Sequence, residues 1–266
     1  MKANVLNLDG KQKAEIQLPE QFQEEIRPDL INRAFLAYRS TLYQPKGHFL
    51  LAGLQTSAAY YGRRHAWRQT INTGRSRLPR EKIAGGRSGR VLIVPHAVKG
   101  RRAHPPKVEK KIIEKINLKE KNAAIRSAIS ASCDAKLLTQ RGHIFAGKAP
   151  LILDNEFESM KKVKDVRATL GKIGIEQDLQ RAINGRKKRS GISGLRRGGY
   201  YTPKSALIVI AEDKGIAKAA RNIPGVDVAK ISQLNADLLA PGGIAGRLII
   251  WTQNAVEKLG KEKLYM

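Results

Sequence analysis

The chain has 266 residues, 41% of them apolar, and carries 50 Lys and Arg against 23 Asp and Glu, for a formal charge of +27. This length and apolar content are enough to bury a core, so we expect the chain to fold at least in part, which excludes a wholly disordered protein. A compact domain with such a charge repels itself unless a polyanion neutralises it, so the candidate partners are RNA, DNA or an anionic membrane surface.

The N-terminus and the cysteine content indicate the compartment. Residues 1–10 lack a charged segment followed by an apolar core, and no stretch approaches 18 consecutive apolar residues. Cys133 is the only cysteine, so an intrachain disulfide and a cysteine-based zinc site are both excluded. We therefore expect a soluble protein of the reducing cytoplasm, with no membrane partner.

Two long segments have the apolar spacing of helices that pack on a sheet. The first covers residues 28–42 and the second residues 120–138. Their apolar residues at helical positions are Leu30, Phe35, Leu36 and Leu42 in the first, and Ala124, Ile125, Ala128, Ile129 and Ala131 in the second.

Between these helices lies a strongly basic segment, residues 45–106. It holds thirteen Lys and Arg against one acid, Glu81, together with eight glycines and five prolines. After the apolar stretch 49–54 it shows no sustained helical or alternating period, so it cannot easily form a core of its own. Ordering an irregular insertion of this length costs conformational entropy that contacts with a partner must offset.

The residue types of this segment favour RNA as that partner. Arginine outnumbers lysine by ten to three, and its planar guanidinium matches phosphate and stacks on bases. Tyr60, Tyr61, His65 and Trp67 lie among the arginines, as expected for stacking on unpaired bases rather than for reading duplex DNA. The alternative interpretation is a solvated, disordered loop.

Residues 142–148 read G-H-I-F-A-G-K, which matches a phosphate-binding loop up to the position of its Ser or Thr, where this chain has Ala149. Such a loop follows a strand and precedes a helix, whereas this one follows a helical segment and precedes a strand. Gly85, Gly86 and Gly89 resemble a dinucleotide loop, but no apolar strand precedes them. Neither motif predicts a nucleotide cofactor.

Three acids open one alternative, a magnesium-dependent RNA-processing enzyme. Asp154, Glu156 and Glu158 follow a predicted strand end, a usual place for catalytic carboxylates. The favoured interpretation is that they are acids at a helix start, which the helix dipole stabilises. The five histidines are scattered without a metal-ligand pair. Cys133 has no basic partner that the sequence identifies, and it suits a small core residue. We therefore expect no metal, no cofactor, no small-molecule substrate and no catalysis.

The second basic segment, residues 186–204, holds seven Lys and Arg and no acid. The two basic segments leave a charge of only +8 for the other 185 residues, so the charge is concentrated. Gly198, Gly199, Tyr200 and Tyr201 connect the second segment to a strand from Ala206. We expect it to bind RNA close to the folded domain.

Short apolar runs alternate with helical patterns in the rest of the chain. The runs 151–153, 206–211, 226–229 and 248–251 read as buried parallel strands. Residues 214–221, 232–239 and 252–259 read as helices, with Ser232 and Thr252 as N-caps. The predicted fold is a layered α/β/α domain over residues 1–266, with a mainly parallel sheet, interrupted by the long basic loop.

Five stretches resemble the fourth protein of the large ribosomal subunit, the L-four family, in its archaeal and eukaryotic form. They are R-P-D-L-I-N-R-A at 27–34, A-G-L-Q-T-S-A at 52–58, G-R-S-R-L-P-R at 74–80, V-P-H-A-V-K-G-R-R-A-H-P-P-K at 94–107 and A-P-G-G-I-A-G-R-L-I-I-W-T at 240–252. These five ordered matches extend from residue 27 to residue 252, so the resemblance covers nearly the whole chain.

The resemblance implies a structural ribosomal protein of the cytoplasm whose loop reaches through large-subunit rRNA to the wall of the peptide exit tunnel. Its implied partners are that rRNA, neighbouring large-subunit proteins and the nascent peptide near the loop tip. The chain departs from the family at residues 63–72, where a more glycine-rich stretch is usual, so the tunnel-facing residue is left open. A third interpretation, a DNA-compacting chromatin protein, fits poorly because such proteins are commonly small or repetitive.

The residues that we expect to contact RNA are the basic and aromatic side chains of the two segments. They are Arg63, Arg64, His65, Trp67, Arg68, Arg75, Arg77, Arg80, Arg87, Arg90, Arg101, Arg102, His104, Arg186, Lys187, Lys188, Arg189, Arg196 and Arg197.

Overall fold

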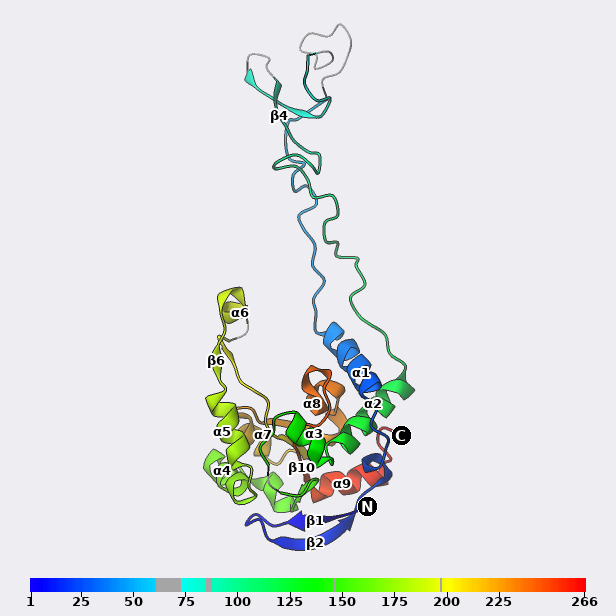
Figure 1. Cartoon of the computed structure of the whole chain (residues 1–266), viewed down its shortest axis with the longest axis vertical. Coiled ribbons are helices and arrows are strands. Elements are labelled where there is room, and N and C mark those ends of the chain that lie inside the picture. Colours follow the sequence, from blue (N-terminus) through cyan, green and yellow to red (C-terminus); the bar gives the residue numbers. More distant parts are fainter. Residues whose placement is uncertain (61–72, 85–87, 146, 197) are drawn as a thin grey trace. The chain divides into compact units, whose positions relative to one another are not determined.

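The computed structural model of the chain describes residues 1–60, 73–84, 88–145, 147–196 and 198–266 (Figure 1). The chain divides into two units. Unit 1 comprises Met1–Leu42 and Ile113–Met266, and unit 2 comprises Tyr43–Ile112.

The described part of unit 1 is built on a six-stranded sheet in the order β2-β1-β5-β10-β8-β9. The strands are β1 (Lys2–Leu6), β2 (Gln12–Gln17), β5 (Leu151–Leu153), β8 (Leu207–Ile210), β9 (Asp227–Lys230) and β10 (Ile249–Thr252). Only the β1-β2 pair is antiparallel; β1-β5, β5-β10, β10-β8 and β8-β9 are all parallel. The predicted mainly parallel sheet is confirmed.

Helices cover both faces of this sheet. Every residue of β8 and β10 is buried, as a parallel sheet between two helix layers requires. Side chains alternate along a strand, so neighbouring residues of β10 enter different cores. Trp251 packs in one core with Ile31, Ile125 and Val256, whereas Ile250 packs in a second core with Leu170, Leu179 and Ala219. The fold is therefore the predicted three-layer α/β/α class.

One helix layer consists of α1 (Pro28–Thr41), α2 (Leu118–Ala131), α8 (Ala236–Leu239) and α9 (Gln253–Lys261). The other consists of α3 (Ala135–Gln140), α4 (Val163–Lys172), α5 (Glu176–Asn184) and α7 (Ile216–Arg221). Short 3-10 helices occur at Glu20–Phe22, Asn155–Ser159, Ile231–Gln233 and Pro241–Gly243. No helix in the described residues is long and apolar enough to cross a bilayer.

Two local predictions need correction, and one element was missed. The helix expected over 120–138 is two helices, because the Asp134 carboxylate accepts the Lys136 N–H and starts α3. Ser232 lies in a 3-10 helix and is not the expected N-cap; the Asn235 side chain instead accepts the Leu238 N–H at 2.9 Å and caps α8. The β1-β2 hairpin was not expected at all.

Thr252 stands at the N-cap position of α9 as predicted, but its hydroxyl makes no cap bond. It donates instead to Glu158 Oε1 at 2.6 Å. A cap bond would need the Thr252 oxygen to accept from a backbone N–H of α9, and the hydroxyl instead acts as a donor to this buried carboxylate.

Unit 2 lacks a core in the part that the structure describes. Pro79 is the one buried residue there, and the apolar side chains of Phe49, Leu50 and Leu51 are at least half exposed. Its regular structure is a short hairpin of β3 (Arg80–Lys82) and β4 (Ser88–Val91). Burial of apolar surface therefore contributes little to its stability.

Candidate nucleic-acid interface

Backbone contacts join the outgoing and returning chains of unit 2. The His48 N–H donates to the Pro106 carbonyl at 3.3 Å, and Ala59 and Arg80 exchange two backbone hydrogen bonds at 2.9 and 3.0 Å. Between these points Gly53, at φ +75°, approaches the backbone of Arg101 so closely that a Cβ atom would lie 2.7 Å from the Arg101 Cα. Glycine, which has no Cβ, permits both this positive φ and this close approach of the two backbones.

Arg80 is used inside unit 2. Its guanidinium donates to the Gly89 carbonyl at 3.1 Å and to the Ser76 hydroxyl at 2.8 Å, which ties the hairpin to the preceding turn. Arg90 lies 3.9 Å from the Glu81 carboxylate across the same hairpin. By contrast, Arg77 and Arg102 have exposed side chains that can reach a partner.

The structure describes only some of the predicted RNA-contacting residues. Those described in unit 2 are Arg75, Arg77, Arg80, Arg90, Arg101, Arg102 and His104, and those described in unit 1 are Arg186, Lys187, Lys188, Arg189 and Arg196. Arg63, Arg64, His65, Trp67, Arg68, Arg87 and Arg197 lie outside the described residues.

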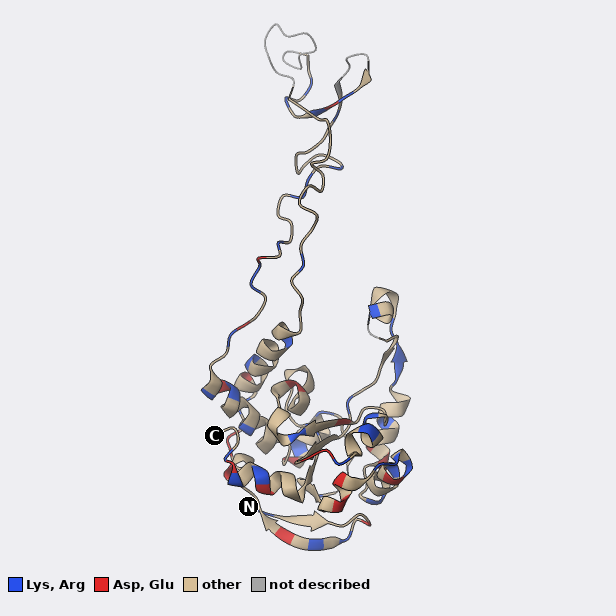
Figure 2. Cartoon of the chain, turned by 180° about the vertical axis from the view of Figure 1, so that it is seen from behind, with Lys and Arg blue, Asp and Glu red and all other residues tan. Residues whose placement is uncertain are grey.

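In unit 1 the second basic segment leaves α5 and forms a two-stranded ribbon of β6 (Lys187–Lys188) and β7 (Tyr200–Tyr201), with α6 (Gly191–Arg196) at its turn (Figure 1). Gly198 and Gly199 have φ of +69° and +78°, a backbone that L side chains rarely adopt, and they turn the chain back into β7. We call residues 186–201 the basic ribbon. Figure 2 shows its strand β6, which consists of two lysines, in blue.

Two cation–π contacts stiffen the basic ribbon. The guanidinium carbon of Arg186 lies 4.3 Å from the ring centroid of Tyr200, and that of Arg189 lies 5.5 Å from the ring centroid of Tyr201. The Arg189 Nε also donates to the Tyr200 carbonyl at 2.9 Å. Both rings are about half exposed, at 49% and 53%.

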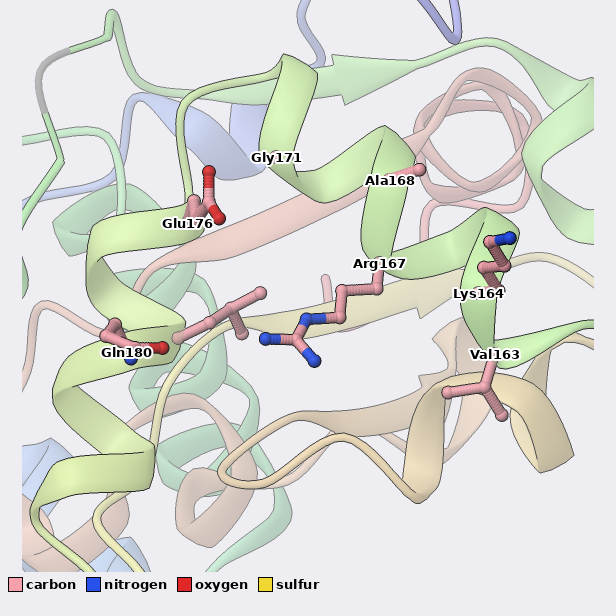
Figure 3. Close-up of a pocket in the computed structure, with 8 residues that line it drawn as sticks. Val163, Lys164, Arg167, Ala168, Gly171, Glu176 and Gln180 are labelled. Atoms are coloured by element: carbon pink, nitrogen blue, oxygen red, sulfur yellow. The ribbon is translucent and has the colours of Figure 1, made fainter.

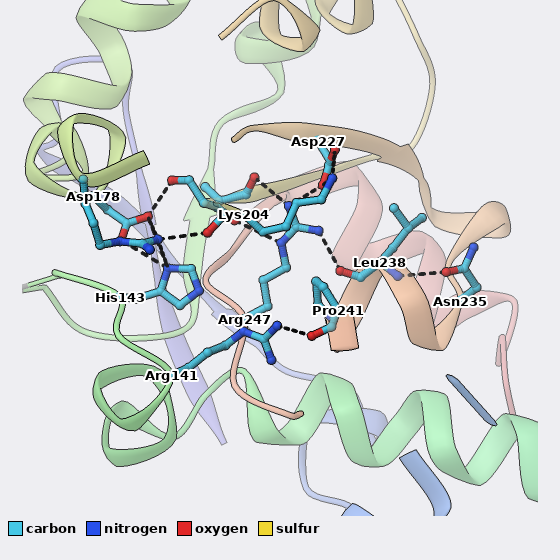
Figure 4. Close-up of polar contacts among 12 residues, drawn as sticks. Arg141, His143, Asp178, Lys204, Asp227, Asn235, Leu238, Pro241 and Arg247 are labelled. Carbon is cyan, nitrogen blue, oxygen red and sulfur yellow. Dashed lines mark hydrogen bonds and ion pairs between the residues drawn. The ribbon is translucent and has the colours of Figure 1, made fainter. Parts of the chain in front are cut away.

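A buried polar cluster fixes the basic ribbon where it joins the rest of unit 1 (Figure 4). Asp178 of α5 is fully buried and accepts from Ile144 N at 3.1 Å, Arg181 Nε at 2.9 Å and Ser205 Oγ. His143 Nδ1 lies 3.2 Å from both of its carboxylate oxygens. Burial alone would raise the pKa of Asp178, but hydrogen bonds from His143, Arg181 and Ser205 hold that pKa well below its ordinary value.

The same cluster bonds to the chain on both sides of the basic ribbon. Arg181 precedes the ribbon and donates to the Lys204 carbonyl at 2.9 Å after it. Arg247 is fully buried and donates to the Ser205 carbonyl at 3.0 Å, to the Leu238 carbonyl at 2.8 Å and to the Asp227 carboxylate. The two ends of the ribbon are thus fixed to the sheet by charged hydrogen bonds rather than by apolar packing.

The sequence did not point to Asp178, His143 or Arg247 as structural residues. For Arg247 a signal existed, since an arginine directly before the all-apolar run 248–251 must be buried with its charge paired. For His143 the sequence offered only the imperfect phosphate-loop pattern. Its partner Asp178 is 35 residues away, and no local pattern links them.

Of the three acids in the enzyme alternative, Asp154 and Glu158 serve structural roles and Glu156 is exposed. Asp154 pairs with Lys13 and accepts the Asn155 N–H at 2.8 Å, and Glu158 accepts from the Ala211 N–H at 3.0 Å and from Thr252. No group of three or more potential metal ligands occurs within the described part of the chain. Burial raises the pKa of the Cys133 thiol to about 11, which disfavours the reactive thiolate.

An open hollow lies between α4 and α5 on unit 1 (Figure 3). Its lining mixes Lys164 and Arg167 of α4 with Glu176, Leu179 and Gln180 of α5. The Arg167 side chain extends across it toward α5. Its lining carries both signs of charge and it opens to solvent, so it is a surface groove rather than an enclosed ligand site.

Comparison with known proteins gives consistent matches. Residues 16–262 match the model of the ribosomal protein L4/L1 family. The large ribosomal subunit protein uL4 of Archaeoglobus fulgidus is 46% identical over 98% of this chain and 99% of its own length. The proteins of the same name from Methanocaldococcus jannaschii and Methanospirillum hungatei are 47% and 45% identical, over 97% and 99% of this chain and 98% and 100% of their own lengths.

Proposed function

Since the chain belongs to the ribosomal protein L4/L1 family, we propose that it is a structural constituent of the large ribosomal subunit that binds large-subunit rRNA through unit 2 and the basic ribbon. The family and the relatives are ribosomal structural proteins, so the chain is not an enzyme. The ribosome is cytoplasmic in archaea, the source of the relatives, and the chain works there.

The observation that carries the proposal is the lack of a core in a strongly charged unit. Residues 45–106 carry thirteen cations against one acid, and the described part of unit 2 buries only Pro79. A few backbone hydrogen bonds contribute about 1 kcal/mol each, far less than the entropy of ordering some sixty residues. Charge-assisted contacts to phosphates supply the missing stabilisation.

In this mechanism the loop, residues 45–106, folds together with rRNA. Its arginines neutralise phosphates that would otherwise repel one another where RNA helices meet, so RNA segments can pack closely. The segment 186–204 binds RNA nearer the domain, because hydrogen bonds from Arg181 and Arg247 fix its ends to the sheet. By binding rRNA in this way, the loop 45–106 and the segment 186–204 support assembly of the large subunit.

The resemblance to the L-four family supports the finer partners of this proposal. The loop tip lines part of the peptide exit tunnel and meets the nascent peptide there. Neighbouring large-subunit proteins contact the globular domain. The exposed apolar side chains of Phe49, Leu50 and Leu51 suit a covered position inside the particle.

Sedimentation tests this proposal directly. Tagged protein expressed in an archaeal host is expected to travel with the large subunit through a sucrose gradient at moderate salt, and to leave it only at high salt because phosphate contacts are screened. A tagged protein with residues 45–106 replaced by a short Gly-Ser linker serves as the comparison and should stay near the top of the gradient. Full-length protein that never enters the subunit fraction would refute the proposal.

A further inference from the structure

The basic ribbon presents the same chemistry on both of its faces. Lys187 lies opposite Tyr201 and Lys188 opposite Tyr200, and directly opposed residues share a face. Alternation along the strand then places Arg186 with Lys188 and Tyr200 on the first face, and Arg189 with Lys187 and Tyr201 on the second. The two cation–π contacts, Arg186 with Tyr200 and Arg189 with Tyr201, agree with this assignment.

Side chains on both faces of the basic ribbon are exposed to solvent. Lys187 and Lys188 are exposed, and the rings of Tyr200 and Tyr201 are 49% and 53% exposed. A ribbon that binds RNA on one surface needs only one basic face. Here the segment 186–204 contains seven cations and no acid.

We propose that the basic ribbon is inserted between two separate segments of rRNA, so that each face binds one of them. Each face offers a tyrosine ring on which an unpaired base stacks and two cations that contact the adjoining phosphates. This inference rests on the proposed function and adds Tyr200 and Tyr201 to the RNA-contacting residues.

The arginines prepare the rings for stacking. Each guanidinium already covers one side of its tyrosine, which holds the ring in place and leaves the other side for a base. The Arg189 contact to the Tyr200 carbonyl further fixes the spacing between the two strands. The geometry therefore exists before RNA arrives, and little side-chain entropy is lost on binding.

Matched variants of the full-length protein separate the two faces. One carries Lys188→Gln with Tyr200→Ala, the other Lys187→Gln with Tyr201→Ala, so each removes one cation and one ring. Both are bound to large-subunit rRNA, and nucleotide protection is mapped by chemical probing. Each variant is expected to lose protection at a different set of nucleotides and to bind about tenfold or more weakly. The combined variant should lose both sets.

Several outcomes would overturn the inference. If both variants lost protection at the same nucleotides, the two faces would contact a single RNA segment, contrary to the proposal. If neither altered the footprint while wild-type protection persisted, the ribbon would face a protein rather than RNA. Tyr200→Phe with Tyr201→Phe keeps both rings and should retain the full footprint, so its loss would refute stacking. Failure of the proposed function looks different, because the wild-type protein itself would then protect no rRNA.

Discussion

Replacing Arg75, Arg77, Arg101 and Arg102 together with glutamine is expected to weaken binding to large-subunit rRNA by at least about a hundredfold. All four side chains are exposed, and the described part of unit 2 has no apolar core that would bury them. Each phosphate that is no longer neutralised reduces the slope of log affinity against log salt by about 0.7–0.9, so the slope should fall by about 3. Filter binding across a salt series measures both quantities.

A matched control keeps the net charge of that variant but changes a different surface. Lys164, Lys218, Arg221 and Lys261 are exposed on α4, α7 and α9 of unit 1, away from both basic segments in the sequence. Their joint replacement by glutamine should change the salt slope by less than about 1, because only nonspecific attraction is removed. Equal effects of the two quadruple variants would show that total charge, and not unit 2, determines the affinity.

Asp178→Asn is expected to destabilise the domain by about 3–5 kcal/mol, a large part of the usual total for a domain. The carboxylate accepts from Arg181, Ser205 and Ile144 and is fully buried. The asparagine amide turns one acceptor into a donor and leaves Arg181 without its charge partner. Urea unfolding at neutral pH measures the loss, and Asp9→Asn, which removes only the exposed pair with Lys172, should leave the midpoint unchanged.

The effect of Asp178→Asn should depend on pH in a defined direction. Because the folded-state pKa of Asp178 is held below its unfolded value of about 3.9, its contribution is complete above that value. As pH falls below about 4 toward the folded pKa, the wild-type protein loses this stability, whereas the asparagine variant has no such group to titrate. The two free energies of unfolding should therefore converge in acid. A difference between these two free energies of unfolding that stays constant down to about pH 2 would contradict the presence of an ionised Asp178 in the folded protein.

Patterns read along the chain predicted the scaffold because its determinants are local. The all-apolar runs at 206–211 and 248–251 are long enough to read as buried strands, and the periodicity of 28–42 needs no partner to be seen as a helix. The β1-β2 hairpin was missed because all but one of the β2 residues are exposed, so the strand shows no strong alternation. Its place at the sheet edge comes from pairing with β1, not from its own side chains.

The basic segments were also visible in the sequence, whereas their anchoring was not. Charge concentration is a compositional property, so residues 45–106 and 186–204 stand out without any structure. The Asp178 cluster joins residues 34 and 35 positions apart, and Arg247 reaches a carbonyl 42 positions away. Such contacts depend on which strands become neighbours, and no local pattern encodes that. Arg80 shows the same limit, since its use inside the hairpin follows from the turn geometry.

Hydrogen exchange on the full-length protein, free and bound to large-subunit rRNA, tests the central claim most directly. With little buried surface in unit 2, amides of residues 88–112 are expected to exchange rapidly in the free protein and to become strongly protected on the RNA. Amides of β8 and β10 should be protected in both states and serve as the internal reference. Equal, strong protection of residues 88–112 with and without rRNA would show that unit 2 orders itself, and the account would be wrong.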